Sequence, residues 1–404
     1  MASPCARTRA ATTTSKPASR AARAAGSRCE QKYQSSVTRK SSFGRDAADR
    51  EDTGSGGSNR LAAAGVEKAR VLSAHRVLFN ASPAQSPAQS EDRLARILVT
   101  GAGGFIGRAL CPALVRHGHV VYGLTRRPAQ PIAGVELSAI GDIAPRTDWS
   151  GHLGGIDVVV HLANRAHRRA GHGEPHDEAE AAAALARAAA RCGVQRLVHM
   201  SSIRAMGDAT PPGSPFRAGD RPRPRDPYGR AKLAIEPALA AAANAAGLEL
   251  VMLRPPLVYG PGVKGNLHAL IRLVASGVPL PFARIDNRRS LIALDNLVAL
   301  TALASFHPAA AGQVLLVRDK VDFSTPQLLA ALAAGLGCQS RLYPLPAPAH
   351  AALRTLPVLG PLFSRLTLSL QVDDRATREL LGWEPAVDPE QGIATAARAF
   401  RSRR

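Results

Sequence analysis

The 404-residue chain carries 52 Lys and Arg residues against 31 Asp and Glu residues, a formal net charge of +21, and 45% of its residues are hydrophobic. This composition suffices for one large or two ordinary domains with a sizeable buried core. No run of Lys and Arg is interleaved with aromatic residues, so the positive charge favours anionic ligands or an anionic membrane surface over nucleic acid.

The five cysteines are scattered and lie at no metal-ligand spacing, so the sequence predicts no metal site, no disulfide framework and a reducing compartment. No stretch of about 18 apolar residues predicts a transmembrane helix. The N-terminus lacks the apolar core of a signal peptide. We therefore expect a cytoplasmic protein.

Residues 1–94 are rich in Ser, Ala, Arg, Thr and Gly without a steady hydrophobic period, and "TGSGGSN" and "SPAQSPAQS" are typical of linkers. We expect this segment to be disordered or to be an extension upstream of the true start of the protein. An Arg- and Ser-rich organelle transit peptide is a further alternative.

From Arg96 onward, predicted strands and helices alternate. Strands are expected at residues 96–100, 119–125, 156–164, 195–202 and 248–256, and helices at residues 107–118, 178–193 and 226–247. This alternation predicts an α/β fold with a Rossmann-type, doubly wound parallel sheet over residues 95–254. After residue 255, Pro and Gly interrupt more often, which predicts a smaller C-terminal lobe over 255–404 with part of the chain returning to the sheet.

The stretch "ILVTGAGGFIGRAL" carries the first chemical motif. Gly101, Gly104 and Gly107 have the spacing at which the first glycine allows a tight turn, the second lets a pyrophosphate approach the backbone, and the third lets the helix lie close to the strand. The helix N-terminus then offers N–H groups to the anion. The loop predicts a dinucleotide site, with Phe105 and Ile106 as further contacts.

The second strand ends in Thr125, Arg126 and Arg127, where an acid that grips the ribose of NAD is usual. A hydroxyl followed by two arginines suits a 2′-phosphate, unless both arginines are merely solvated, so NAD and NADP both remain open. Further expected cofactor contacts are Asp142 and Ile143 near the adenine, and Leu162 and Ala163 of "HLAN" at 161–164 beside the nicotinamide ribose. Tyr228 and Lys232 are the remaining ones, with Lys232 on the ribose hydroxyls.

"DPYGRAK" places Tyr228 and Lys232 four positions apart, on one face of a predicted helix. A nearby ammonium lowers the pKa of a phenol, which is normally about 10, so Tyr228 is a candidate general base. Ser202 ends the predicted strand "QRLVHMSS", at the edge of the sheet where α/β proteins bind ligands. Its hydroxyl could bind the reacting oxygen.

Together these motifs make residues 96–385 resemble an extended short-chain dehydrogenase/reductase of the NAD-dependent epimerase/dehydratase type, which acts on nucleotide sugars. The resemblance implies Ser202, Tyr228 and Lys232 as the catalytic triad and a homodimer as the assembly. It also implies a C-terminal lobe that binds a nucleoside diphosphate sugar.

The resemblance assigns three residues to that sugar nucleotide. Asn266, at the end of "RPPLVYGPGVKGN", matches the family's diphosphate-contacting Asn, and Arg289 of "NRRSLIALDNLV" matches an arginine on the nucleotide phosphates. Lys264 is a further phosphate contact or a solvated loop lysine. The chain departs from the family at Glu178, which stands where an Asn usually begins a helix, and at "AMG", which replaces V-Y-G after the serine.

Two enzyme activities fit these residues. The first is a 4-epimerase of UDP-glucose, UDP-N-acetylglucosamine or a relative, with a polyprenyl diphosphate-linked sugar as a variant. The second is an NADPH-dependent 4-ketoreductase of a 4-keto-6-deoxy nucleotide sugar, which Arg126 and Arg127 favour. Ile203 and Arg204 follow Ser202 where a 4,6-dehydratase has an acidic pair, so a dehydratase is not expected. A non-enzymatic dinucleotide sensor is remote, because the chain keeps Tyr228 and Lys232. The apolar "LPVLGPLF" at 356–363 suggests either membrane proximity or ordinary packing.

Overall fold

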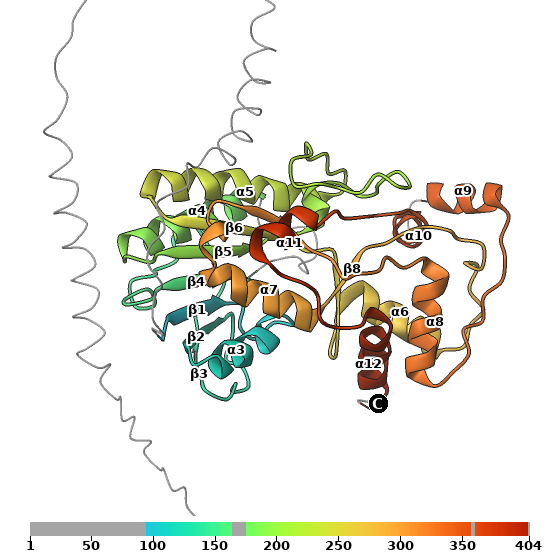
Figure 1. Cartoon of the computed structure of the whole chain (residues 1–404), viewed down its shortest axis with the longest axis horizontal. Coiled ribbons are helices and arrows are strands. Elements are labelled where there is room, and N and C mark those ends of the chain that lie inside the picture. The colour runs from blue at the N-terminus through green and yellow to red at the C-terminus, as the bar shows by residue number, and fades with distance from the viewer. Residues whose placement is uncertain (1–93, 164–174, 357–359, 403–404) are drawn as a thin grey trace, which may run out of the picture.

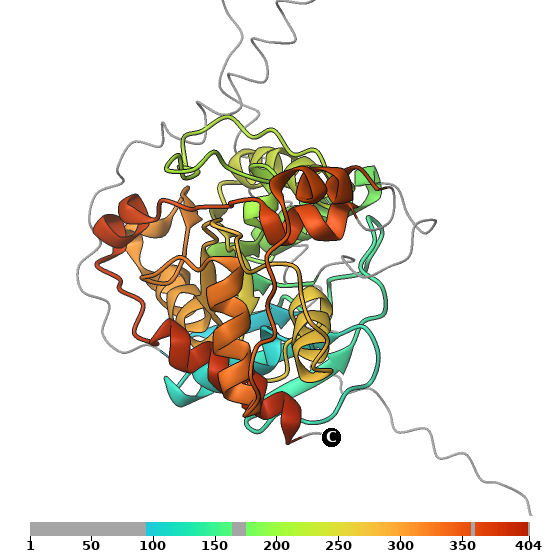
Figure 2. The same ribbon diagram turned by 90° about the vertical axis from the view of Figure 1, so that its right-hand side faces the viewer.

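The computed structural model describes residues 94–163, 175–356 and 360–402 (Figures 1 and 2). The expectation for residues 1–94 therefore lies outside the described residues, except at Leu94. The same holds for residues 357–359 within the apolar segment at 356–363. None of the helices in the described ranges is long and apolar enough to cross a membrane.

Seven parallel strands form the main sheet, in the order β3-β2-β1-β4-β5-β6-β9. They are β1 (Arg96–Thr100), β2 (Val120–Thr125), β3 (Val135–Ala139), β4 (Val158–His161), β5 (Arg196–Met200), β6 (Glu249–Arg254) and β9 (Val314–Leu316). This confirms the predicted Rossmann-type sheet. The strand order reverses between β1 and β4, so a crevice opens beyond their carboxyl ends, where such sheets bind ligands.

Helices cover both faces of the sheet (Figure 1). They are α3 (Gly107–Arg116) and α7 (Leu294–Phe306) on one face, and α4 (Pro175–Arg191) and α5 (Pro227–Ala246) on the other. Successive strand residues point to opposite faces, so Val99 and Val160 pack toward α3 and α7, whereas Leu98 and Val159 pack toward α4 and α5.

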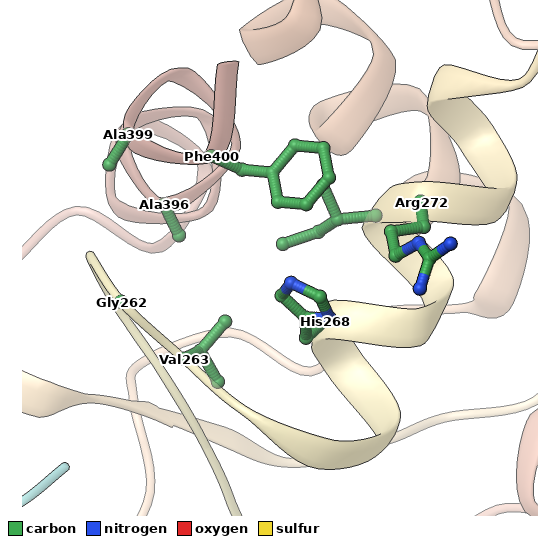
Figure 3. A pocket seen from close by; sticks show the side chains of 8 residues that line it. Gly262, Val263, His268, Arg272, Ala396, Ala399 and Phe400 are labelled. Carbon is green, nitrogen blue, oxygen red and sulfur yellow. The ribbon is translucent and has the colours of Figure 1, made fainter. Parts of the chain in front are cut away.

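Part of the chain beyond residue 255 forms a second lobe with its own core. That core is centred on Ile271, Leu329 and Ile393. Besides α7 and β9, the described chain beyond residue 255 contains β7 (Leu257–Tyr259), α6 (Gly265–Ala275), β8 (Leu291–Ala293), η2 (Pro308–Ala310), α8 (Thr325–Leu336), α9 (Ala347–Thr355), α10 (Gly360–Thr367), α11 (Arg375–Leu381) and α12 (Pro389–Arg401). β7 and β8 pair in parallel. Between α6 and α12 lies a cavity of about 320 Å³, where His268 and Phe400 meet edge to face (Figure 3).

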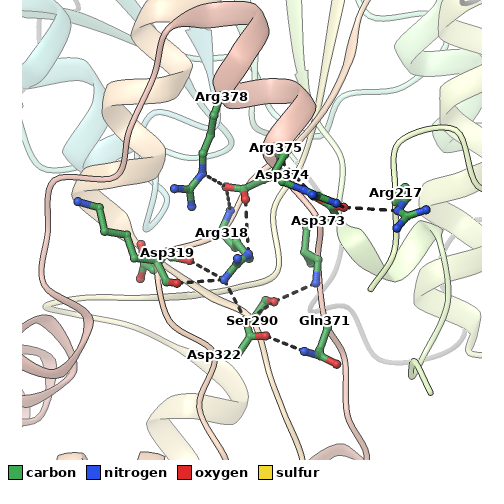
Figure 4. Close-up of polar contacts among 12 residues, drawn as sticks. Arg217, Ser290, Arg318, Asp319, Asp322, Gln371, Asp373, Asp374, Arg375 and Arg378 are labelled. Atoms are coloured by element: carbon green, nitrogen blue, oxygen red, sulfur yellow. Dashed lines mark hydrogen bonds and ion pairs between the residues drawn. The ribbon is translucent and has the colours of Figure 1, made fainter. Parts of the chain in front are cut away.

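A buried polar network ties the C-terminal segment to the chain that follows β9 (Figure 4). Asp374, at the start of α11, accepts a hydrogen bond from Arg378 Nε at 2.9 Å and pairs with Arg318 Nε at 3.4 Å. Gln371 donates to Asp322 at 2.9 Å. α7, β9 and α11 thus lie with the main sheet although they follow residue 255, because these contacts and the shared apolar core hold them there.

Two strands of the sheet, β3 and β9, are not among the five that the sequence predicted, although part of the chain beyond residue 255 was expected to return to the sheet. β3 has the sequence "VELSA" and forms the edge of the sheet, where all five of its residues are at least partly exposed. An edge strand needs no continuous apolar run, because only one of its sides pairs with the sheet, so its sequence lacks the signal that marked the central strands.

Candidate active site

The glycine loop connects β1 to α3 and has no room for side chains at two of its glycines. Gly101 has φ +74°, and a Cβ there would lie 2.9 Å from the backbone nitrogen of Ala163. A Cβ at Gly107 would lie 2.6 Å from Cα of Ala102. α3 therefore begins directly against the loop, and the Gly101 N–H donates to the carbonyl of Leu124 at 2.8 Å.

A cavity of about 840 Å³ opens at the crevice between β1 and β4. The expected cofactor residues that line it are Gly101, Gly104, Thr125, Arg126, Asp142, Ile143, Leu162 and Ala163. Five others do not line it, of which Tyr228 and Lys232 belong to α5. Gly107 is the first residue of α3, Ile106 is its N-cap, and Phe105 packs against the cores of both lobes.

The residues at this cavity fit a dinucleotide. No side chain caps the N-terminus of α3, and its first turn contains no acidic residue, so the positive end of the helix is available to a pyrophosphate. Gly104 is exposed, so an anion can approach its backbone. The cavity also has the volume that small-molecule and cofactor sites commonly have.

At the adenosine end of the cavity, the charges are paired. Arg126 Nη1 lies 3.8 Å from Asp142 Oδ1, and both side chains are well exposed. The Thr125 hydroxyl donates to the carbonyl of Arg127 at 2.8 Å, so it is engaged within the loop itself. The arginine expected to meet a 2′-phosphate thus has a carboxylate neighbour that the sequence analysis had placed near the adenine.

Lys232 lies on the buried face of α5, with only 2% of its surface exposed. Its Nζ donates to the carbonyl of Met200, at the end of β5, at 3.1 Å. Burial lowers the pKa of Lys232 to about 8, and the carboxylates of Glu178 and Glu236 oppose that shift. Glu178 lines the cofactor cavity, so the chain's departure from the family pattern places a negative charge near this ammonium.

Two histidines lie beside Lys232: His161, which begins the "HLAN" stretch expected at the nicotinamide ribose and lines the cofactor cavity, and His199, to which the sequence assigned no role. His161 and His199 occupy matching positions on β4 and β5, and their rings stack at 5.4 Å. Burial, followed by the charge of Lys232, lowers the pKa of His161 to about 3 and also lowers that of His199, so both rings are neutral. In the sequence, the similar stretches "VVVH" and "RLVH" in two neighbouring strands are the signal that could have predicted this histidine pair.

Ser202 and Tyr228 lie on neighbouring segments. Ser202 precedes the short helix η1 (Ile203–Ala205), and its Oγ accepts the N–H of Arg204 at 3.2 Å. Tyr228 is the second residue of α5 and is partly buried, and α5 packs against η1. The fold therefore brings the end of β5 and the start of α5 together, with Tyr228 one helical turn before Lys232.

The neighbouring Ser201 has a different role. Its hydroxyl donates to Glu236 Oε1 at 2.6 Å, and the same carboxylate receives Arg254 Nε at 2.9 Å. The side chains of Glu236 and Arg254 are 3% and 1% exposed. This buried ion pair joins α5 to β6, so Ser201 is engaged in a structural contact, whereas Ser202 Oγ contacts the N–H of Arg204.

The expected sugar-nucleotide residues belong to the second lobe. Lys264 is the N-cap of α6, Asn266 is in its first turn, and both are exposed. Arg289 is partly buried and donates to the carbonyl of Leu368 at 2.9 Å. Burial, with the charges of two other arginines, lowers its pKa to about 10. The described residues supply no carboxylate partner for Arg289. None of the three residues lines the cavity between α6 and α12.

The chain is similar to several known enzymes. The chain is 38% identical to a UDP-glucose 4-epimerase of Vibrio cholerae, over 75% of this chain and 95% of that protein. It is 30% identical to a UDP-glucose 4-epimerase of Mycolicibacterium smegmatis, over 76% of this chain and 99% of that protein. A dTDP-6-deoxy-L-talose 4-dehydrogenase (NAD(P)(+)) of Kitasatospora kifunensis is 32% identical over 51% of this chain and 64% of its own length.

A solved structure is also similar. MoeE5 in complex with UDP-glucuronic acid and NAD aligns with a TM-score of 0.63 and 26% identity, over 77% of this chain and all of that one. Residues 97–317 match the sequence pattern of the NAD dependent epimerase/dehydratase family. The match spans the whole Rossmann-type sheet, from β1 to β9. The chain therefore belongs to the NAD-dependent epimerase/dehydratase family.

Proposed function

We propose that this protein is a nucleotide-sugar 4-epimerase that acts on UDP-glucose, UDP-N-acetylglucosamine or a close relative. The observation that carries the proposal is the placement of Ser202, Tyr228 and the buried Lys232 around the junction of β5 and α5, next to the cofactor cavity. The 38% identity to the UDP-glucose 4-epimerase of Vibrio cholerae, across nearly its whole length, supports the same activity.

In this proposal Gly101, Gly104 and the N-terminus of α3 hold the pyrophosphate of the cofactor. A nicotinamide dinucleotide bound there supplies the acceptance and return of a hydride at sugar C4. Tyr228 takes the proton of the 4-hydroxyl and later returns it, and Ser202 donates a hydrogen bond to the same oxygen. Lys232, with a pKa of about 8, is mostly protonated at pH 7, and its charge favours the phenolate of Tyr228.

Residues 95–254 serve the cofactor, and the lobe within residues 255–404 serves the diphosphate of the sugar nucleotide. Arg289 supports this division, because a largely desolvated guanidinium beside other arginines gains most from an anion. A diphosphate can accept two parallel hydrogen bonds from it. Lys264 and Asn266, both exposed at the N-terminus of α6, are the further contacts proposed.

The test is an NMR assay of the purified protein with UDP-glucose or UDP-N-acetylglucosamine and substoichiometric NAD. Accumulation of the C4 epimer to an equilibrium mixture is the expected result, and Tyr228→Phe should abolish it. Unchanged turnover by Tyr228→Phe would refute the assignment of the base. No epimer from either sugar would count against the epimerase proposal itself.

A second candidate is a 4-ketoreductase of a 4-keto-6-deoxy nucleotide sugar. The observation that favours it is Arg126, an exposed cation on the cofactor cavity that suits the 2′-phosphate of NADPH. The 32% identity to a 4-dehydrogenase from Kitasatospora kifunensis points the same way. Stoichiometric oxidation of NADPH by a 4-keto-6-deoxy sugar nucleotide, without epimerisation of UDP-glucose, would establish this alternative.

We also propose that the protein is a homodimer, as the resemblance to this family implies. Light scattering in solution should return about twice the 42.3 kDa mass of one chain. A mass equal to one chain at micromolar concentration would contradict it.

A further inference from the structure

Arg204 connects the two segments that carry Ser202 and Tyr228. Its backbone N–H donates to Ser202 Oγ at 3.2 Å, so it belongs to the turn that holds the serine. Its side chain leaves that turn and reaches the start of α5, where Nη2 pairs with the carboxylate of Asp226. Asp226 is the N-cap of α5 and accepts the N–H of Gly229, so it fixes the helical turn that contains Tyr228.

The guanidinium of Arg204 is held on both sides. Nη2 also pairs with Asp208 Oδ1 at 2.9 Å, and Nη1 donates to the carbonyl of Asp208 at 3.4 Å. The side chains of Arg204 and Asp226 are only 17% and 18% exposed, so solvent screens this pair less than it screens a surface ion pair. Two carboxylates thus hold the guanidinium of Arg204, whose charge also helps to lower the pKa of Arg289.

The backbone completes the connection. A Cβ at Gly229 would overlap the carbonyl oxygen of Arg204, so the first turn of α5 lies directly on the turn that follows Ser202. This contact, with the bonds of Lys232 to Met200 and of Glu236 to Arg254, orients the body of α5. The charge pair between Arg204 and Asp226 acts at the N-cap of α5, two residues before Tyr228.

We infer that Arg204 is a positioning residue, which holds Tyr228 at its working distance from Ser202 through the carboxylate of Asp226. This inference rests on the proposed roles of Ser202 and Tyr228 and adds a residue that touches neither substrate nor cofactor. A guanidinium suits the task better than an ammonium, because its planar fork contacts two carboxylates at fixed angles.

The test measures kcat and KM for Arg204→Gln, Asp226→Asn and the double variant. The assay is whichever of the two reactions the wild type catalyses, epimerisation or 4-keto reduction. Asp226→Asn keeps an oxygen that caps α5 but removes the charge that attracts Arg204. We expect kcat to fall about 10- to 100-fold in each single variant with little change in KM, because a small misplacement of a reacting group acts on the chemical step. The double variant should be no slower than the slower single variant, because both changes remove one contact.

Arg204→Lys should recover part of the lost kcat, and Arg217→Gln is the matched control. Arg217 is an exposed arginine that pairs with Asp373 at 3.4 Å, and its replacement should leave kcat unchanged. Losses of kcat that multiply in the double variant, or a kcat of Arg204→Gln within about twofold of the wild type, would overturn the inference.

Hydrogen–deuterium exchange separates this inference from the proposed activity. In Arg204→Gln, the amides at the start of α5 should exchange faster, while those in its buried second half stay protected. Unchanged exchange at the start of α5 would overturn the inference even if turnover fell. A wild type that converts no UDP-sugar would refute the epimerase proposal without affecting the exchange result.

Discussion

The replacement Lys232→Met should stabilise the protein while it abolishes turnover. Burial lowers the pKa of Lys232 from 10.5 to about 8, even with the favourable carboxylates included. At about 1.4 kcal/mol for each pKa unit, keeping this group charged in the folded protein costs about 3 kcal/mol. Met has a similar length and carries no charge, but it leaves the carbonyl of Met200 without the Nζ–H donor, a loss of about 1 kcal/mol. The expected net gain is about 2 kcal/mol at pH 7.

The stability difference between Lys232→Met and the wild type should change with pH in one direction. Below about pH 8, Lys232 is protonated in both the folded and the unfolded chain, so the full cost of burying the charge is present. Between about pH 8 and 10.5 the unfolded chain binds more protons than the folded one, so the stability of the wild type rises with pH. The advantage of Lys232→Met should therefore shrink over this range.

The assay is urea unfolding of both proteins without added cofactor, at pH 7 and at pH 9.5. A variant that is less stable than the wild type at pH 7 would refute the reasoning, because it would mean that the ammonium is not penalised by its surroundings. An advantage that stays constant between the two pH values would show that the gain comes from packing rather than from charge.

Three other predictions concern the loop, the adenosine end and the core. Gly107→Ala should weaken NAD binding at least about tenfold by calorimetry, because the new Cβ would lie 2.6 Å from the Cα of Ala102. Gly151→Ala is the control and should bind NAD normally, because no atom lies within 4 Å of the added Cβ. Arg126→Ala should lower the preference for NADP over NAD several-fold, and an unaltered ratio of the two dissociation constants would show that the arginine contacts no 2′-phosphate. Glu236→Gln leaves the buried Arg254 charge without its carboxylate, so urea unfolding should show a loss of about 3–5 kcal/mol, and a loss under 1 kcal/mol would contradict this account of the pair.

The sheet was predictable because its central strands carry a signal that is local in sequence. β1, β4 and β5 are short, almost wholly buried apolar runs. Edge strand β3 has no such run and was missed. β9 returns to the sheet by pairing with β6, and Arg318 and Asp374, which are 56 positions apart, join α11 to the chain after β9. No local sequence pattern predicts contacts between segments so far apart.

The candidate site also has features that the sequence predicts and features that depend on tertiary contacts. The spacing of Tyr228 and Lys232 puts both on one helical face, and that geometry needs only the α-helix. Whether Lys232 is charged depends on burial and on Glu178, which comes from another helix. Likewise the pairing of Arg126 with Asp142 arises because neighbouring strands of the sheet end at the same edge.

The sequence by itself determined the type of fold, the glycine loop and the order of the motifs, because turn geometry and hydrophobic periodicity act over a few neighbouring residues. Only the tertiary structure decided which charges meet. It joined Arg204 to Asp226, left Arg289 without a carboxylate among the described residues, and placed a neutral histidine pair beside Lys232. The physical reason is that desolvation and Coulomb interactions depend on distances through space, and these are set only when strands and helices distant in sequence come together.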